Sequence, residues 1–111
     1  MAIKCVMAMV KPNLTDRIVE AAKKSGASGA TVLSASGTGA GEAKTFFGLT
    51  LDIGTDVVVF LLDDTLVDPV LNAIEEAGRF NEPGTGVAFV VPVEKAVGLR
   101  AAGRDGGHIS A

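Results

Sequence analysis

The sequence predicts a small α+β domain in which two helices cover one face of an antiparallel β-sheet. Short apolar runs bounded by Pro, Gly or Asp indicate strands, and two stretches with apolar side chains at every third or fourth position indicate helices. The 111 residues are enough for one domain, and a hydrophobic content of 48% is enough to bury a core.

The first strand and the first helix are indicated by the N-terminal 28 residues. Residues 3–11 form an apolar run with β-branched and sulfur-containing side chains, which predicts a strand. Residues 13–28 repeat apolar side chains with a helical period, and Asn13 or Thr15 is expected to cap the helix start. Gly26 is expected to stop the helix.

The rest of the chain repeats this pattern. Strands are predicted at 30–36, 56–64 and 87–99, a helix at 65–78, and weaker strand character at 45–52. Thr65 and Asp68 resemble a capping box for the second helix, and Pro92 suits an edge strand. The order is β-α-β, loop, β-α-β, which is the ferredoxin-like plan. One domain is expected over residues 1–99, followed by a flexible tail over 100–111.

The strands are apolar on both faces, which predicts that neither face of the sheet is left in water. A sheet with one solvated face alternates apolar and polar side chains, but residues 57–62 and 5–10 are apolar throughout. The two predicted helices cover only one face. Because a bare apolar patch of several hundred Å² is adhesive, a second copy of the chain is expected to cover the other face.

Composition argues against several classes of protein. The net charge is −3, the pI is about 5.0 and no basic stripe is present, so nucleic acid is not expected as a main partner. Cys5 is the only cysteine, which excludes an internal disulfide. The start of the chain lacks the pattern of a signal peptide, and no apolar run approaches the roughly 20 residues of a membrane span. A soluble, cytoplasmic protein without direct membrane insertion is expected.

Candidate catalytic and metal-binding residues are few. His108 is the only histidine and lies in the predicted tail, which argues against a Ser-His-Asp or Cys-His arrangement. Cys5 lies within an apolar strand and is expected to be a small buried hydrophobe. The pair Asp63-Asp64 is expected to cap a helix rather than to act as an acid and base. Neither a metal site nor a cofactor is expected.

Two glycine corners are the remaining candidates for chemistry. One lies at residues 37–41 and the other at 84–86, and each contains Gly-Thr-Gly. Neither is a Walker loop or a dinucleotide fingerprint. Each corner is therefore either a flexible connection or a nest of backbone N–H groups that holds an anion. Arg100 and Arg104 follow the last predicted strand and could add positive charge.

Four stretches together resemble the PII signal-transduction family over residues 3 to about 100. They are VKPN, GATVLSASGTG, LVDPVLNAIEEAG and, most specifically, GTGVAFVVPVEKAVGLR. The pattern is similar to that of divergent PII-like proteins with a short T-loop, including the carboxysome-associated group. Here the T-loop would span about residues 40–53.

The resemblance implies a homotrimer with an adenine nucleotide in each of three clefts between subunits. One subunit would supply the second strand, the T-loop base and the B-loop, and the next would supply the C-loop. Thr31 would face the adenine, and the glycines at 84–86 would turn amides towards phosphate. The implied nucleotide-binding residues are Thr31, Gly37, Thr38, Gly39, Gly84, Thr85, Gly86, Val87 and Arg100, with Lys44 and Arg104 as further candidates.

The sequence departs from the family pattern where the family has basic residues. Val87 and Gly98 stand at two such positions, and Thr55 is nearest to a third. Because hydrogen bonds to charged groups are worth about 1.5–3 kcal/mol each, their loss should weaken ATP binding most and favour ADP, AMP or a cyclic nucleotide. The chain has no tyrosine, which excludes uridylylation in the usual manner.

The expected function is a non-enzymatic regulator of a membrane transporter or of an enzyme in inorganic-carbon or nitrogen metabolism. Similarity to the carboxysome-associated group adds bicarbonate as a candidate ligand. One alternative is a hydrolase of the acylphosphatase type, although only Lys11 and Asn13 follow the first strand as phosphate-gripping residues. A second is a metal-tolerance trimer, against which the lack of clustered His, Cys and Met argues.

Overall fold

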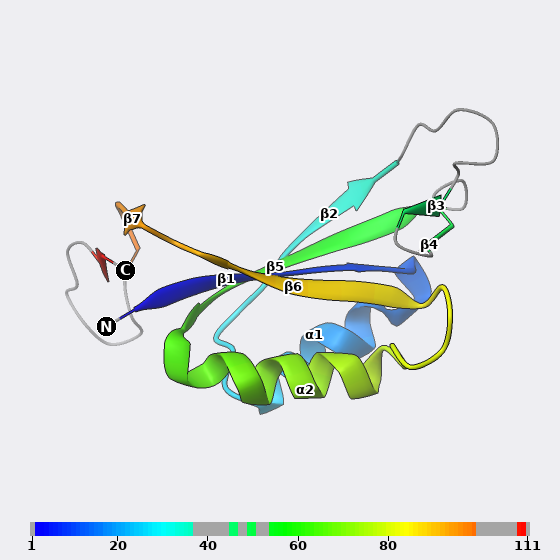
Figure 1. The fold of residues 1–111 in the computed structure, drawn as a ribbon, viewed down its shortest axis with the longest axis horizontal. Helices are drawn as coiled ribbons and strands as arrows, with labels where there is room; N and C mark the ends of the chain where they lie inside the picture. Colours follow the sequence, from blue (N-terminus) through cyan, green and yellow to red (C-terminus); the bar gives the residue numbers. More distant parts are fainter. Residues whose placement is uncertain (1, 37–44, 47–48, 51–53, 100–108, 111) are drawn as a thin grey trace.

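A four-stranded antiparallel sheet with two helices on one side forms the fold (Figure 1). The computed structural model describes residues 2–36, 45–46, 49–50, 54–99 and 109–110. The strand order is β2-β5-β1-β6. The strands are β1 (Ile3–Val10), β2 (Thr31–Ala35), β5 (Thr55–Asp63) and β6 (Gly86–Pro92), and the helices are α1 (Thr15–Lys24) and α2 (Val67–Ala77). The predicted ferredoxin-like α+β fold is confirmed.

Smaller elements flank this frame. A 3₁₀ turn precedes each helix, at Pro12–Leu14 and Asp64–Leu66. Two short ribbons pair β3 (Thr45–Phe46) with β4 (Leu49–Thr50), and β7 (Lys95–Ala96) with β8 (Ile109–Ser110). The strand predicted over 87–99 is shorter than expected and ends at Pro92, whose ring nitrogen carries no hydrogen for the ladder. Within the four-stranded sheet β6 pairs with β1 alone, so Pro92 does lie in an edge strand.

The core lies between the helices and the facing side of the sheet. Alternate residues of the two central strands point into it, as the strand period requires. The helices contribute residues at intervals of four, so the predicted amphipathic pattern is confirmed. The fully buried side chains include Val6, Ala8, Val10, Val58, Phe60, Ile18, Ala22, Val70 and Ile74. Burying each larger aliphatic or aromatic side chain contributes about 1.5–3 kcal/mol.

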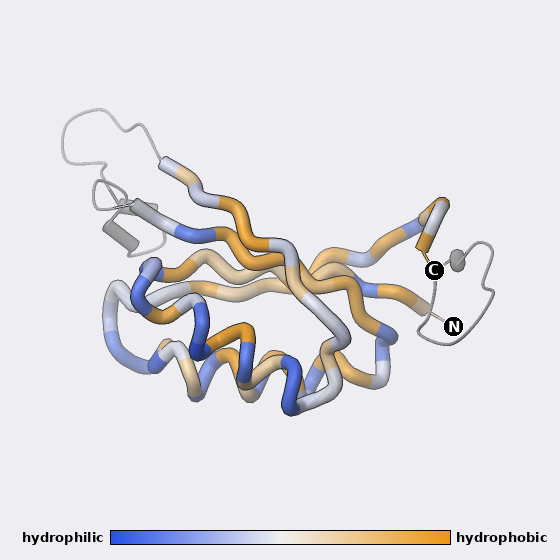
Figure 2. Tube along the Cα trace, turned by 180° about the vertical axis from the view of Figure 1, so that it is seen from behind, coloured by the Kyte–Doolittle hydropathy of each residue, from blue (hydrophilic) through white to orange (hydrophobic). Residues whose placement is uncertain are grey.

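The other side of the sheet has no helix over it (Figure 1 and Figure 2). The strand register places three apolar rows there: Leu33, Val57, Met9 and Val87; Thr31, Val59, Met7 and Phe89; Leu61, Cys5 and Val91. Leu33 exposes 53% of its surface and Leu61 exposes 46%. We call these three rows the open sheet face. The prediction that both faces of the sheet are apolar is confirmed.

The side-chain caps predicted for the two helices are wrong. Leu14 precedes α1 without a capping side chain, and the hydroxyl of Thr15 instead donates to Asp56 Oδ2 at 2.6 Å. The capping box of Thr65 and Asp68 is likewise not formed at α2. Both helices are entered from a 3₁₀ turn, so the residue before each helix lacks the extended backbone that a capping side chain requires.

Some predictions fall on residues that the structure does not describe. Most of the T-loop predicted at about 40–53 lies outside the described residues, and so does the predicted tail at 100–111 apart from Ile109–Ser110. Within the described part of the chain, neither helix has the length and apolar character to cross a bilayer.

Candidate ligand-binding site

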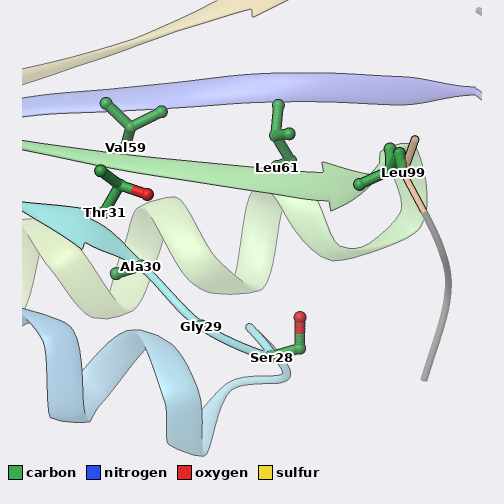
Figure 3. A pocket seen from close by; sticks show the side chains of 7 residues that line it. All are labelled: Ser28, Gly29, Ala30, Thr31, Val59, Leu61 and Leu99. Carbon is green, nitrogen blue, oxygen red and sulfur yellow. The ribbon is translucent and has the colours of Figure 1, made fainter. Parts of the chain in front are cut away.

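A pocket of about 240 Å³ opens beside the start of β2 (Figure 3). Its walls come from the segment that leads into β2, from β5 and from the residue that precedes Arg100. The lining residues are Ser28, Gly29, Ala30, Thr31, Val59, Leu61 and Leu99. Thr31, which the resemblance to the PII family implies to face an adenine, is therefore a pocket residue.

The pocket is apolar with a few polar groups, which is the usual character of a small-molecule site. Val59, Leu61 and Leu99 provide aliphatic surface, and Ser28 and Thr31 add hydroxyl groups (Figure 3). Its lining among the described residues contains no charged side chain. Such a pocket suits a flat, uncharged ring and is a poor site for phosphate.

The second glycine corner, Gly84–Gly86, joins the loop after α2 to β6. Gly84 has a φ of +77°, in the left-handed region that favours glycine. A Cβ atom on Gly86 would lie 2.5 Å from Cε1 of Phe80 and 3.0 Å from the carbonyl oxygen of Met9. Glycine is therefore favoured at Gly84 by the backbone conformation and at Gly86 by the space that Phe80 occupies.

Thr85, between these glycines, fixes the shape of the corner. Its buried hydroxyl lies 2.8 Å from the carbonyl oxygen of Arg79 and 3.1 Å from that of Glu82, to which it donates. The side chain is thus used inside the loop, and contact with a ligand would have to come from the backbone. Among the described residues, the N–H groups of Gly84 and Thr85 have no hydrogen-bond acceptor.

The Gly84–Gly86 corner and the pocket are separate within one chain. One row of the sheet runs through Gly86, Val10, Asp56 and Ser34. Gly86 and Ser34 therefore lie at the same end of the sheet. They are three strand spacings apart, or about 14 Å. Thr31 therefore lies apart from the corner within one chain, and its pocket neighbours include Leu99.

The structure describes Val87 and the two other positions at which the sequence lacks a basic residue, but it does not describe six of the predicted site residues. Val87 is half-buried in β6, and Gly98 has a φ of +84°, where an arginine would be strained. Thr55, at the third position without a basic residue, is buried. Outside the described residues lie Gly37, Thr38, Gly39, Lys44, Arg100 and Arg104.

The structure describes Asp63 and Cys5, two of the candidate catalytic groups. Asp63 accepts hydrogen bonds from the hydroxyl and the N–H of Thr65, which lower the pKa of its carboxyl group and cap the 3₁₀ turn. The prediction that this acidic pair caps a helix start is confirmed for Asp63, which caps the 3₁₀ turn before α2. Cys5 lies on the open sheet face, where partial burial raises the pKa of its thiol. The residues that the structure describes contain no group of three His, Cys, Asp or Glu side chains placed to hold a metal ion.

Sequence reasoning missed most of the pocket lining. The alternation along β5 could have placed Val59 and Leu61 on one face, but their proximity to Thr31 follows from a strand register that a single sequence does not specify. Leu99 follows β7 and lies in the stretch GTGVAFVVPVEKAVGLR, but the resemblance assigns a role in binding to Arg100 and none to Leu99. These residues are brought together by the fold alone.

The fold and the pocket define a ferredoxin-like α+β domain with a ligand-sized pocket at the edge of an open, apolar sheet face. A family model described as nitrogen regulatory protein P-II matches residues 3–103. The chain is 31% identical to the nitrogen regulatory protein P-II of Azospirillum brasilense, over 96% of this chain and 100% of that protein. It is 36% identical to the nitrogen regulatory protein GlnK2 of Haloferax mediterranei, over 93% of this chain and 89% of that protein.

The chain belongs to the nitrogen regulatory protein P-II family. The resemblance found in the sequence is confirmed, and the chain is a signal-transduction regulator of that family.

Proposed function

We propose that this protein is a homotrimeric, cytoplasmic regulator that binds an adenine nucleotide in clefts between its subunits. The occupied clefts would control binding to a partner protein. The observation that carries the proposal is the pocket at the edge of the open sheet face, because a second copy laid on that face would deepen the pocket.

Assembly is supported by the exposed apolar surface. Phe89 exposes 37% of its surface and Val91 exposes 41%, beside the more exposed Leu33 and Leu61. Each Å² of apolar surface removed from water contributes about 25 cal/mol. Three copies, rather than two, are what the resemblance to the PII family implies.

Nucleotide binding is supported by two surfaces with complementary chemistry. The pocket around Thr31 suits an adenine ring, and the Gly84–Gly86 corner offers phosphate two backbone N–H groups that have no acceptor among the described residues. They lie at different places on the sheet of one chain. One ligand can use both surfaces if the corner of one subunit approaches the pocket of the next.

The proposed preference is for ADP or AMP over ATP. Val87 is neutral, and the backbone at Gly98 disfavours any side chain. Two charge-assisted contacts are therefore absent, and the third phosphate of ATP would suffer most. Calorimetric titration with ATP, ADP, AMP and cyclic AMP tests this preference. ATP binding much more tightly than ADP and AMP would contradict it.

The proposed partner is a membrane transporter or an enzyme of inorganic-carbon or nitrogen metabolism, with bicarbonate as a second candidate ligand. A small anion could use the N–H groups of Gly84 or Thr85 that a shorter nucleotide leaves free. Thermal denaturation with each nucleotide, with and without bicarbonate, tests this ligand. A bicarbonate effect that requires nucleotide would support it, and no effect in any combination would remove bicarbonate from the proposal.

A further inference from the structure

Lys11 lies beside the position at which β6 lacks a basic residue. It follows β1 directly with an extended backbone, at φ −68° and ψ 140°, so the alternation of the strand places it on the same face as Met9. Met9 is directly opposite Val87 in β6. Lys11 is thus a diagonal cross-strand neighbour of Val87, a relation in which long side chains reach one another.

The Gly84–Gly86 corner next to Lys11 has the character of an anion site. Gly84 adopts a left-handed conformation, and the N–H groups of Gly84 and Thr85 have no acceptor in the described part of the chain. The hydroxyl of Thr85 holds this geometry from inside the loop. N–H groups fixed in this way form a concavity that binds anions.

We infer that Lys11 supplies the positive charge for a phosphate held at the Gly84–Gly86 corner, and that the preferred ligand is a nucleoside diphosphate. The inference rests on the proposed nucleotide binding and names the residue that sets the number of phosphates. One ammonium group beside two N–H groups neutralises the added charge of a second phosphate. Positions 87 and 98 offer no cation for a third.

The other charged side chains around the corner are not equivalent to Lys11 as a source of positive charge. Arg79 and Glu82 carry opposite charges in the same loop, and both are exposed. The carboxylate of Asp56, near the start of β5, accepts a hydrogen bond from Thr15, the first residue of α1. Arg79→Gln is therefore a matched control, because it removes one positive charge from the loop that contains the corner, whereas Lys11 lies at the end of β1.

The test compares the full chain with its Lys11→Gln and Arg79→Gln variants by calorimetric titration with ADP and AMP. Lys11→Gln is expected to weaken ADP by about tenfold or more and AMP by much less, so the preference for ADP falls. Arg79→Gln and the charge-retaining Lys11→Arg are expected to keep the preference. An unchanged preference in Lys11→Gln overturns the inference while leaving nucleotide binding intact. Failure of the unsubstituted chain to bind either nucleotide overturns both.

A second variant separates charge from folding. Adding Val87→Lys to Lys11→Gln returns an ammonium group to the same face of the sheet, one strand away. The double variant is expected to regain the preference for ADP. If the double variant has the same mass and unfolding midpoint as the wild-type chain but no preference for ADP, a cation on this face does not set the preference, and the inference is overturned.

Discussion

At the residue scale, the hydroxyl of Thr85 is the contact that gives the Gly84–Gly86 corner its shape. Thr85 is only 9% exposed, and its acceptors are carbonyl oxygens of the same loop. Thr85→Val is expected to lower the free energy of unfolding by about 1–2 kcal/mol, whereas Thr85→Ser keeps the donor and serves as the control. Urea denaturation at fixed protein concentration measures the difference. Equal stability of the two variants would contradict the role of the hydroxyl.

A second prediction at this scale concerns the acid side of the stability profile. Hydrogen bonds from Thr65 lower the pKa of Asp63 in the folded state. The folded state therefore binds this proton less readily, and the stabilisation is complete above the ordinary aspartate pKa of about 3.9. It disappears as the pH falls through the lower pKa of the folded state.

The Asp63→Ala variant measures this effect. The wild-type chain is expected to be more stable than the variant near pH 7, and the gap should close below about pH 4. Asp64→Ala removes an exposed carboxylate next to Asp63 and is the control. A gap that stays constant with pH would show that the carboxylate form of Asp63 does not matter.

At the scale of the elements, the ring of Phe80, which follows α2, occupies the space next to Gly86 at the start of β6. The contact distances leave no room for a methyl group at Gly86. Gly86→Ala is expected to destabilise the fold by about 1–3 kcal/mol. Adding Phe80→Leu should recover part of that loss, since it removes the nearest ring atom. No recovery in denaturation experiments would assign the cost to the Met9 carbonyl contact instead.

Element positions could be predicted because apolar runs and helical periods are local properties. Residues 57–62 indicated both a strand and a second apolar face, and Gly26, with φ at +121°, ends α1 as expected. The role of Thr15 could not be predicted, because its partner Asp56 is 41 residues away and depends on helix packing. The place of Leu99 in the pocket could not be predicted either, because the other lining residues, such as Thr31 and Val59, are distant from it in the sequence.

At the scale of the whole molecule, the open sheet face is expected to hold the oligomer together. Phe89 lies in its middle row, opposite Met7. Phe89→Glu would place a charge in the covered interface and is expected to dissociate the oligomer and to abolish nucleotide binding. Asn72→Glu, on the exposed side of α2, is the matched control. A folded Phe89→Glu variant with unchanged mass would exclude this face as the interface.

The most direct test of the whole account is the mass of the unsubstituted chain in dilute solution, measured by light scattering or sedimentation. One chain has a mass of 11.2 kDa. Because the open sheet face should be covered by further copies, the particle is expected to have three times that mass and to bind nucleotide in that state. A well-behaved particle with the mass of one chain would contradict both the assembly and the clefts that depend on it.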